Sequence, residues 1–218
     1  LPDELRIVPA LPFWLERAAL AFAMLWFVNL VNFMDGIDWM TVAETVPVTA
    51  GLAVLGGFGA LSSSGMLVAL ALCGAVIGFA PLNRPVAKLF LGDVGSLAIG
   101  LLLAWLLADL AGHGHLVAAL LLPLYYLADA TITLFRRIAR REAIWAAHRG
   151  HFYQRATQRG LSVMAVVGRV FAVNIALAAL AIASVAWNGL AVQLITLACG
   201  AALVAWLLVV FETGKGTR

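Results

Sequence analysis

Charged residues are scarce in this chain of 218 residues: they make up 11% of it, whereas hydrophobic residues make up 64%. A soluble domain of this size cannot hide so much apolar surface in its core, so the composition excludes that class and indicates a helical membrane protein with several spans. Cysteine is scarce as well. Cys73 and Cys199 both lie in apolar runs, and nothing in their surroundings indicates a disulfide or a metal site.

Apolar windows of a length suited to crossing a bilayer recur along the chain. One crossing needs about 20 mostly apolar residues. Seven windows approach this length: residues 12–33, 41–61, 66–81, 95–111, 116–135, 164–186 and 190–211. The sequence therefore predicts an all-α, polytopic transmembrane bundle of about seven spans, forming a single integral-membrane domain over residues 1–218.

Basic residues are distributed unevenly between the two ends of these windows. If the windows alternate in direction, residues 34–40, 82–94, 136–163 and 212–218 share one side of the membrane. These segments hold 11 of the 14 Lys and Arg residues: two in the second segment, seven in the third and two in the fourth. Basic loops remain preferentially on the cytoplasmic side, so we expect this side to be cytoplasmic.

A first polar cluster follows the first window, in the string NLVNFMDGID. Asn29, Asn32 and Asp35 recur at intervals of three, so on a helix they lie on one side. Gly36 then interrupts the pattern and lets Asp38 turn back toward the same space. Polar groups next to lipid are costly, which makes the cluster a candidate functional site. The alternative is a polar helix end that dips into the headgroups.

A second polar cluster, FLGDVGS, opens the fourth window. Gly92 and Gly95 flank Asp93 closely and let the backbone approach a ligand. Ser96 is expected to cap the helix that begins there, and the free N–H groups of a helix N-terminus favour phosphate. A carboxylate beside phosphate requires a cation between them, and Mg²⁺ bridges such groups. The alternative is an ordinary Gly-Asp turn with a capping serine.

A third polar cluster combines Asp129, about two turns inside the fifth window, with the string AHRGHFYQRA in the longest basic loop. Asp129 is expected either to pair with an arginine one or two turns further on or to act in catalysis. His148 and His151 suit a phosphate contact or a proton donor. Phe152 and Tyr153 suit either stacking on a base or a place at the membrane interface. The arginines of this loop favour anionic substrates and lipid headgroups.

Together the strings NLVNFMDGID (29–38), FLGDVGS (90–96) and AHRGHFYQRA (147–156), with Asp129 upstream, resemble the polyprenyl-phosphate N-acetylhexosamine-1-phosphate transferases of glycosyl transferase family 4. This superfamily includes the bacterial undecaprenyl-phosphate GlcNAc-1-phosphate transferases and the phospho-N-acetylmuramoyl-pentapeptide transferase of peptidoglycan synthesis. Its members transfer a sugar 1-phosphate from a UDP-sugar to a membrane polyprenyl phosphate with Mg²⁺ and release UMP. The HFYQR ending looks more like the O-antigen and envelope-polysaccharide branch than the peptidoglycan enzyme, which typically carries three consecutive histidines there.

The resemblance implies a UDP-N-acetylhexosamine donor, an undecaprenyl phosphate acceptor and an active site on the cytoplasmic face of the bacterial inner membrane. It allows a homodimer and implies no nucleic-acid partner. It also implies a role for each matching residue. The metal ligand would be Asp93, the catalytic residues Asp35, Asp38, His148 and His151, and the substrate-binding residues Asn29, Asn32, Gly92, Ser96 and Arg149. Direct attack of the acceptor phosphate on the β-phosphate is favoured over a covalent aspartyl intermediate, because a phosphate monoester with a second pKa near ~6 is mostly ionised at neutral pH.

Two departures from the family pattern bear on these expectations. Trp39 stands where the family usually has glycine after the second aspartate, and no acidic Asp-Asp pair precedes Asn29. We therefore expect the chain to be an N-terminally truncated form of a protein with ten or eleven spans, covering the C-terminal two-thirds of the family fold, and to be inactive alone. Two rival interpretations are a transporter, which should show an internal repeat, and a non-catalytic membrane partner.

Overall fold

The computed structural model describes residues 6–143 and 149–214, and every regular element in these ranges is a helix. The helices are α1 (Phe13–Met34), α2 (Met40–Gly57), α3 (Ser63–Phe79), α4 (Gly92–Gly112), α5 (Leu116–Leu121), α6 (Leu124–Ala139), α7 (Phe152–Gln158), α8 (Val163–Ala186) and α9 (Leu190–Thr213). The predicted all-α architecture is therefore confirmed.

Five of these helices, α1, α2, α4, α8 and α9, are long and apolar enough to cross a membrane. Helix α3 is equally apolar but has 17 residues. The predicted fifth span is divided into α5 and α6, because Pro123 stands at the junction and has no N–H for a continuous helix. The polytopic bundle is thus confirmed, with one of its expected spans broken.

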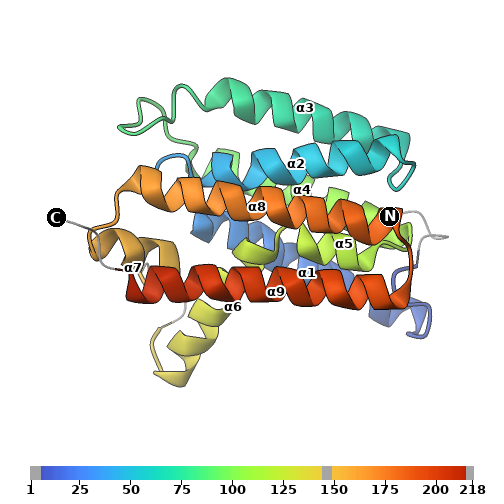
Figure 1. The fold of residues 1–218 in the computed structure, drawn as a ribbon. Coiled ribbons are helices and arrows are strands. Elements are labelled where there is room, and N and C mark those ends of the chain that lie inside the picture. The colour runs from blue at the N-terminus through green and yellow to red at the C-terminus, as the bar shows by residue number, and fades with distance from the viewer. Residues whose placement is uncertain (1–5, 144–148, 215–218) are drawn as a thin grey trace.

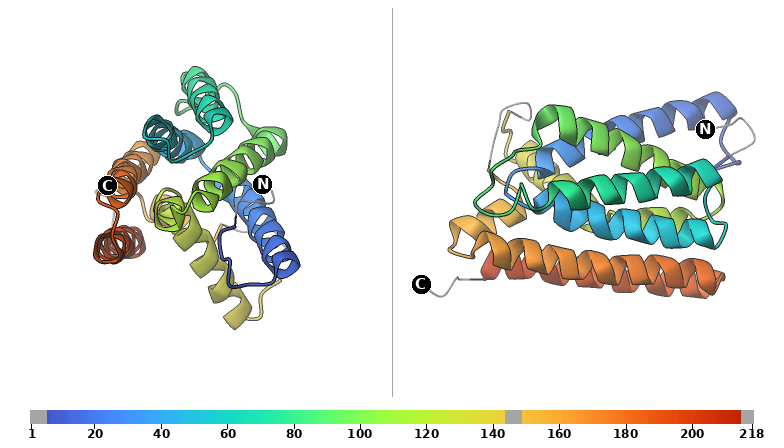
Figure 2. Two further views of the ribbon diagram at one scale, coloured as in Figure 1. Left: turned by 90° about the vertical axis from the view of Figure 1, so that its right-hand side faces the viewer. Right: turned by 90° about the horizontal axis from the view of Figure 1, so that it is seen from above.

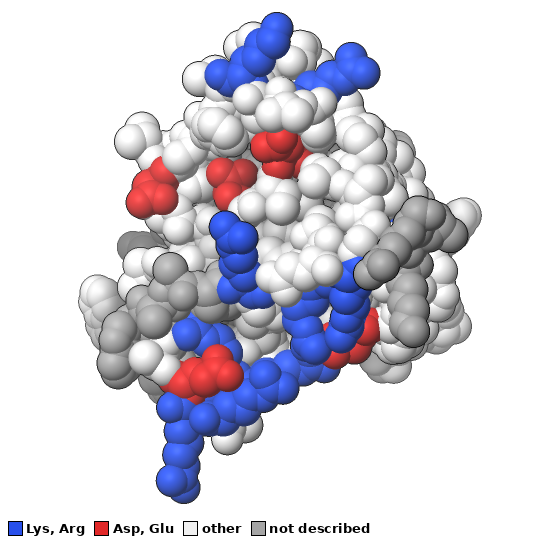
Figure 3. Space-filling model, turned by 90° about the vertical axis from the view of Figure 1, so that its left-hand side faces the viewer, with Lys and Arg blue, Asp and Glu red and all other residues white. Residues whose placement is uncertain are grey.

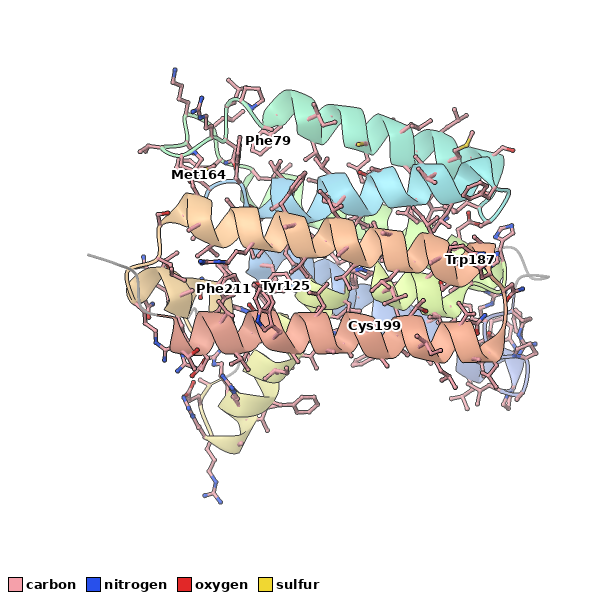
Figure 4. The ribbon with its side chains drawn as sticks, viewed as in Figure 1. Phe79, Tyr125, Met164, Trp187, Cys199 and Phe211 are labelled. Atoms are coloured by element: carbon pink, nitrogen blue, oxygen red, sulfur yellow. The ribbon has the colours of Figure 1, made fainter. Side chains whose placement is uncertain are left out.

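The long helices lie nearly side by side (Figures 1 and 2). Helix α2 packs between α3 and α8, α8 packs on α9, and α1 runs along α4. Helix α6 projects away from the bundle (Figure 2). Its base is held by Tyr125, whose ring meets Phe211 of α9 edge to face with centroids 6.4 Å apart (Figure 4). Such aromatic pairs stabilise a contact by about 0.5–1.5 kcal/mol beyond the apolar area that they bury.

Side-chain caps fix where several of these helices begin. The hydroxyl of Ser62 accepts from Gly65 N at 3.0 Å to start α3, and that of Ser162 accepts from Ala165 N at 3.1 Å to start α8. Asp109 of α4, which is 3% exposed, secures the first of these turns, since its Oδ2 accepts from the N–H and the hydroxyl of Ser62.

The segments expected to share one side of the membrane do lie at one end of the bundle. Residues 35–39, 80–91, 140–143 and 149–162, the last of which include α7, all lie at the left of Figure 1, and we call this the basic end. Viewed face-on, one group of acidic side chains lies between an upper and a lower group of Lys and Arg, and other acidic side chains lie among the lower group (Figure 3). All three sequence motifs fall at this end.

Candidate active site

Asn32 joins the first motif to the second. Its side-chain Nδ2 donates to Asp93 Oδ1 at 3.0 Å and to Ser96 Oγ at 2.8 Å. The close packing of α1 on α4 makes this contact possible, because a Cβ on Gly100 would lie 3.0 Å from the Cα of Val28. Residues that are 61 positions apart in the chain therefore form one polar site at the basic end.

The start of α4 differs from the prediction. The helix begins at Gly92, whose φ of +62° favours glycine, and the preceding Leu91 provides no side-chain cap. Ser96 does not cap the helix, so that prediction was wrong. Its hydroxyl lies one turn inside α4, where it donates to the carbonyl of Gly92 at 3.0 Å and accepts from Asn32. Asp93 stands exposed in the first turn.

Asp35 lies half-buried where α1 ends and accepts a hydrogen bond from the hydroxyl of Thr41. Burial raises the pKa of the Asp35 carboxyl above its ordinary range, and the hydrogen bond from Thr41 opposes part of the rise. The carboxyl thus has a weaker tendency to ionise than a solvent-exposed aspartate, which suits a group that positions an anion or holds a proton.

Asp38 holds the loop between α3 and α4. Its Oδ2 accepts from Ala87 N at 3.0 Å. Trp39 adds two bonds to the same loop: its backbone N–H donates to Asn83 Oδ1 at 2.8 Å, and its indole N–H donates to the carbonyl of Ala80 at 2.6 Å. The contacts of Asp38 therefore fix the segment that leads to Asp93.

The backbone conformation at position 39 explains why the family usually has glycine where this chain has Trp39. Its φ is +65°, in the left-handed region that side chains rarely adopt. The bonds to Asn83 and Ala80 hold a tryptophan there. Asn83 itself is 7% exposed and donates to the carbonyl of Leu89 at 2.9 Å. Asn83 was not among the residues predicted from the sequence, where its one indication is a place between two prolines in a turn.

Asp129 caps helix α7 from the neighbouring helix α6. It is completely buried and accepts from five donors at 3.1–3.4 Å: the hydroxyls of Tyr125 and Thr133, Nδ1 of His151, and the backbone N–H groups of Phe152 and Tyr153. A carboxylate at a helix N-terminus satisfies its free N–H groups and interacts favourably with the helix dipole.

This arrangement corrects the expectation that Asp129 pairs with an arginine one or two turns on. Arg136 pairs instead with Glu212 at 3.5 Å and Arg137 with Glu142 at 3.3 Å. Both expectations for the aromatic pair after His151 were also wrong, because Phe152 is 3% and Tyr153 0% exposed, inside the protein core.

Helix α7 packs directly on the turn that follows α1. A Cβ on Gly36 would lie 2.2 Å from the hydroxyl oxygen of Tyr153 and 2.9 Å from Nε2 of Gln154. The same hydroxyl donates to the carbonyl of Phe33 at 3.4 Å. Only glycine therefore fits between the two carboxylates of the first motif, and the third motif is in contact with the first.

The remaining candidates are placed as follows. His151 is 3% exposed at the start of α7, and Arg149 is exposed two residues before it. The amide of Asn29 donates to the carbonyl of Leu25 at 2.8 Å, one turn back in α1. His148 lies outside the described residues.

Among the described residues, no three His, Cys, Asp or Glu side chains form a cluster suited to a metal ion. Mg²⁺ does not require one, because it is usually held by one or two carboxylates and fills its other positions with water and phosphate oxygens. Asp93 offers such a site: its carboxylate is exposed, it is oriented by Asn32, and it lies beside the N-terminus of α4. The residues present therefore fit a hydrated Mg²⁺ ion.

Comparisons with known proteins indicate the family of the chain. The family described as "Glycosyl transferase family 4" matches residues 4–111. A phospho-N-acetylmuramoyl-pentapeptide-transferase of Carboxydothermus hydrogenoformans is 43% identical over 84 residues, which are 38% of this chain and 25% of that protein. A probable undecaprenyl-phosphate N-acetylglucosaminyl 1-phosphate transferase of Bacillus subtilis is 29% identical over 188 residues, 76% of this chain and 51% of that protein.

The matched regions thus span between a quarter and about half of the length of these two relatives. Residues 4–111, which match the family, contain the Asn/Asp motif, the Gly-Asp motif and the contact from Asn32 to Asp93 that unites them. On these grounds the chain belongs to glycosyl transferase family 4, the superfamily of polyprenyl-phosphate N-acetylhexosamine-1-phosphate transferases.

Proposed function

We propose that the protein transfers an N-acetylhexosamine 1-phosphate from a UDP-sugar to a membrane polyprenyl phosphate and releases UMP. The observation that carries the proposal is the contact of Asn32 with both Asp93 and Ser96, which assembles hard oxygen ligands at the end of a membrane bundle. Both substrates are anionic, and basic residues flank this acidic site (Figure 3). This charge distribution suits the joining of two phosphates.

The repulsion between the two phosphates must be reduced for the reaction to occur. Bound Mg²⁺ would supply that charge neutralisation, and we assign its binding to Asp93. Asn32 donates to one oxygen of this carboxylate and so fixes its orientation. The free N–H groups in the first turn of α4 add a positive potential beside Asp93, which favours a phosphate group there.

Asp35 is proposed to position the acceptor phosphate. The acceptor needs no strong base, since a phosphate monoester is mostly ionised at neutral pH. A partly buried carboxyl with a raised pKa can share a proton with the phosphate instead of repelling it. Asp38 is a less direct participant, because its bond to Ala87 N stabilises the loop before Asp93.

Residues of the third motif are proposed to contact the diphosphate of the donor. Arg149 is exposed at the basic end and carries the permanent charge that such a contact requires. His151 is fixed through Nδ1 by Asp129, so a contact with substrate would use its other ring nitrogen. His148 is assigned the same role from the motif alone.

The donor is proposed to be a GlcNAc-like UDP-sugar used in O-antigen or envelope-polysaccharide synthesis. The Bacillus subtilis relative aligns over 76% of the chain, whereas the Carboxydothermus hydrogenoformans and Lactiplantibacillus plantarum pentapeptide transferases align over 38% and 46%. The HFYQR ending supports the same branch. The muramoyl-pentapeptide donor is the second candidate, favoured by its higher local identity of 43%. The basic end would face the cytoplasm of a bacterial inner membrane, as the excess of Lys and Arg suggests.

The test is release of UMP from membranes that contain the protein, supplied with undecaprenyl phosphate, Mg²⁺ and a panel of UDP-sugars. We expect turnover with UDP-N-acetylhexosamines and its loss in Asp93→Asn. Because the Asp93 side chain is exposed, that variant should retain its melting temperature. The matched control is Val94→Ala, since the Val94 side chain is 89% exposed, and it should keep its activity. Undiminished UMP release from Asp93→Asn would remove Asp93 from the site, and turnover with the muramoyl-pentapeptide donor alone would select the second candidate.

A further inference from the structure

The basic end contains a separate pocket of about 280 Å³ between the last turns of α6 and helix α7. Five arginines line it, three from α6 and its C-terminal end and two from the third motif, with a single carboxylate among them. They are Arg136, Arg137, Arg140, Arg149 and Arg155, and the carboxylate is Glu142.

The positive charge of this pocket exceeds what nearby carboxylates neutralise. Glu142 is 3.3 Å from Arg137 and 4.0 Å from Arg140. On the other side, Glu212 of α9 pairs with Arg155 at 2.7 Å and with Arg136 at 3.5 Å. Two carboxylates thus pair with four of the five guanidinium groups, and Glu212 also lies 3.6 Å from Arg159, outside the pocket. Guanidinium forks bind phosphate oxygens in pairs. The chemistry of the pocket calls for a phosphate-bearing ligand.

The placement of α6 indicates where that phosphate comes from. This helix projects from the bundle (Figure 2) and exposes Ile132, Phe135 and Ile138, which are 38%, 64% and 49% exposed. In a membrane protein such side chains face lipid. The arginines alternate with them along the same two turns, so the pocket lies at the depth where acyl chains meet headgroups.

We infer that this pocket binds the headgroup of an anionic phospholipid such as phosphatidylglycerol, with the acyl chains beside the exposed apolar side of α6. The phosphate would connect arginines of α6 with Arg155 of α7. The anionic lipid would thus hold the third motif at the membrane surface. This inference does not depend on the proposed transferase activity.

Lipid binding by the purified protein in a non-ionic detergent tests the inference. The protein is titrated with phosphatidylglycerol or with phosphatidylcholine of the same acyl chains, and bound lipid is counted by native mass spectrometry. We expect phosphatidylglycerol to bind at least tenfold more tightly. Arg140→Gln should weaken its binding about fivefold, the effect of one basic residue near an anionic surface. Arg141→Gln is the matched control, because Arg141 is the next residue, is exposed and lies outside the pocket lining, and its effect should stay below twofold.

Three results would overturn the inference. Equal retention of the two lipids would show that headgroup charge is not recognised. Equal losses in Arg140→Gln and Arg141→Gln would assign binding to diffuse surface charge. Displacement of phosphatidylglycerol by an equal concentration of UDP or inorganic phosphate would assign the pocket to a soluble anion. Melting temperatures of both variants, measured alongside, identify any loss that comes from unfolding.

Discussion

Replacing Asp129 by asparagine should release α7 from the bundle without unfolding the rest of the protein. Asparagine has nearly the same shape, but one carboxylate oxygen becomes an NH₂ group. Each oxygen of Asp129 accepts from one backbone N–H of α7, from Phe152 at 3.1 Å and from Tyr153 at 3.4 Å. Whichever way the amide is oriented, one of these N–H groups faces another donor.

The size of the effect follows from the bonds that are lost or weakened. A buried donor left unsatisfied costs about 1–3 kcal/mol. The bonds that remain on the amide oxygen, to the second N–H and to the side chains that share this oxygen, lose the charge that made them about twice as strong as neutral ones. The lower cost of burying a neutral group offsets part of this loss. We expect α7 to be destabilised by about 3 kcal/mol, which corresponds to opening about 100-fold more often.

Hydrogen exchange of the amides of residues 152–158 measures this opening directly. Exchange in α7 should become about 100-fold faster in Asp129→Asn, while exchange in α8 and α9 stays unchanged. The matched control is Asp109→Asn, since Asp109 is also buried and also secures a helix start, that of α3. It should loosen residues near Ser62 and leave α7 protected. Unchanged protection of α7 in Asp129→Asn, or equally faster exchange throughout the protein, would refute the capping role.

Two further substitutions test the contacts between motifs. Gly36→Ala places a Cβ 2.2 Å from the hydroxyl of Tyr153, so we expect about 1–3 kcal/mol of destabilisation and at least tenfold slower UMP release. The control is Gly74→Ala, which should match wild type because a Cβ on Gly74 would have nothing within 4 Å. An unimpaired Gly36→Ala variant would contradict the close packing of α7. Thr41→Val removes the hydrogen bond that lowers the pKa of Asp35, so this pKa should rise further. The acidic limb of the pH–activity profile should then move to higher pH. An unshifted acidic limb would exclude Asp35 as the group that titrates there.

The features predictable from the sequence are those set by length and polarity. Apolar windows near 20 residues gave the helical spans, and their alternation placed Asn32 and Asp93 at the same end, where they form a hydrogen bond. The break at Pro123 was missed, because the window around it is apolar on both sides. Proline counts as an apolar residue when spans are predicted from composition, although it lacks the backbone N–H that a continuous helix needs.

The functions of individual polar side chains were harder to predict, since they depend on partners far along the chain. Asp129 was expected either to pair with a nearby arginine or to act in catalysis, yet two of its five donors are backbone N–H groups of a helix that begins 23 residues later. Every residue except proline carries a backbone N–H group, so the sequence does not indicate which of these groups will donate to a given carboxylate. Likewise Ser96 follows the usual pattern of a cap, but the positive φ of Gly92 starts α4 earlier and leaves Ser96 to receive Asn32.

The attachment of α7 through Asp129 has a consequence for how proteins with this site can diverge. Since α6 holds the first turn of α7 and Gly36 receives its side, the position of His151 does not depend on the length of the connection that follows Ala139. In general, doubling the length of a loop costs only about 0.6 kcal/mol. Insertions, deletions and changes of composition there should be tolerated by the fold. This connection is therefore a place where new substrate preferences can arise during evolution while the histidine stays fixed.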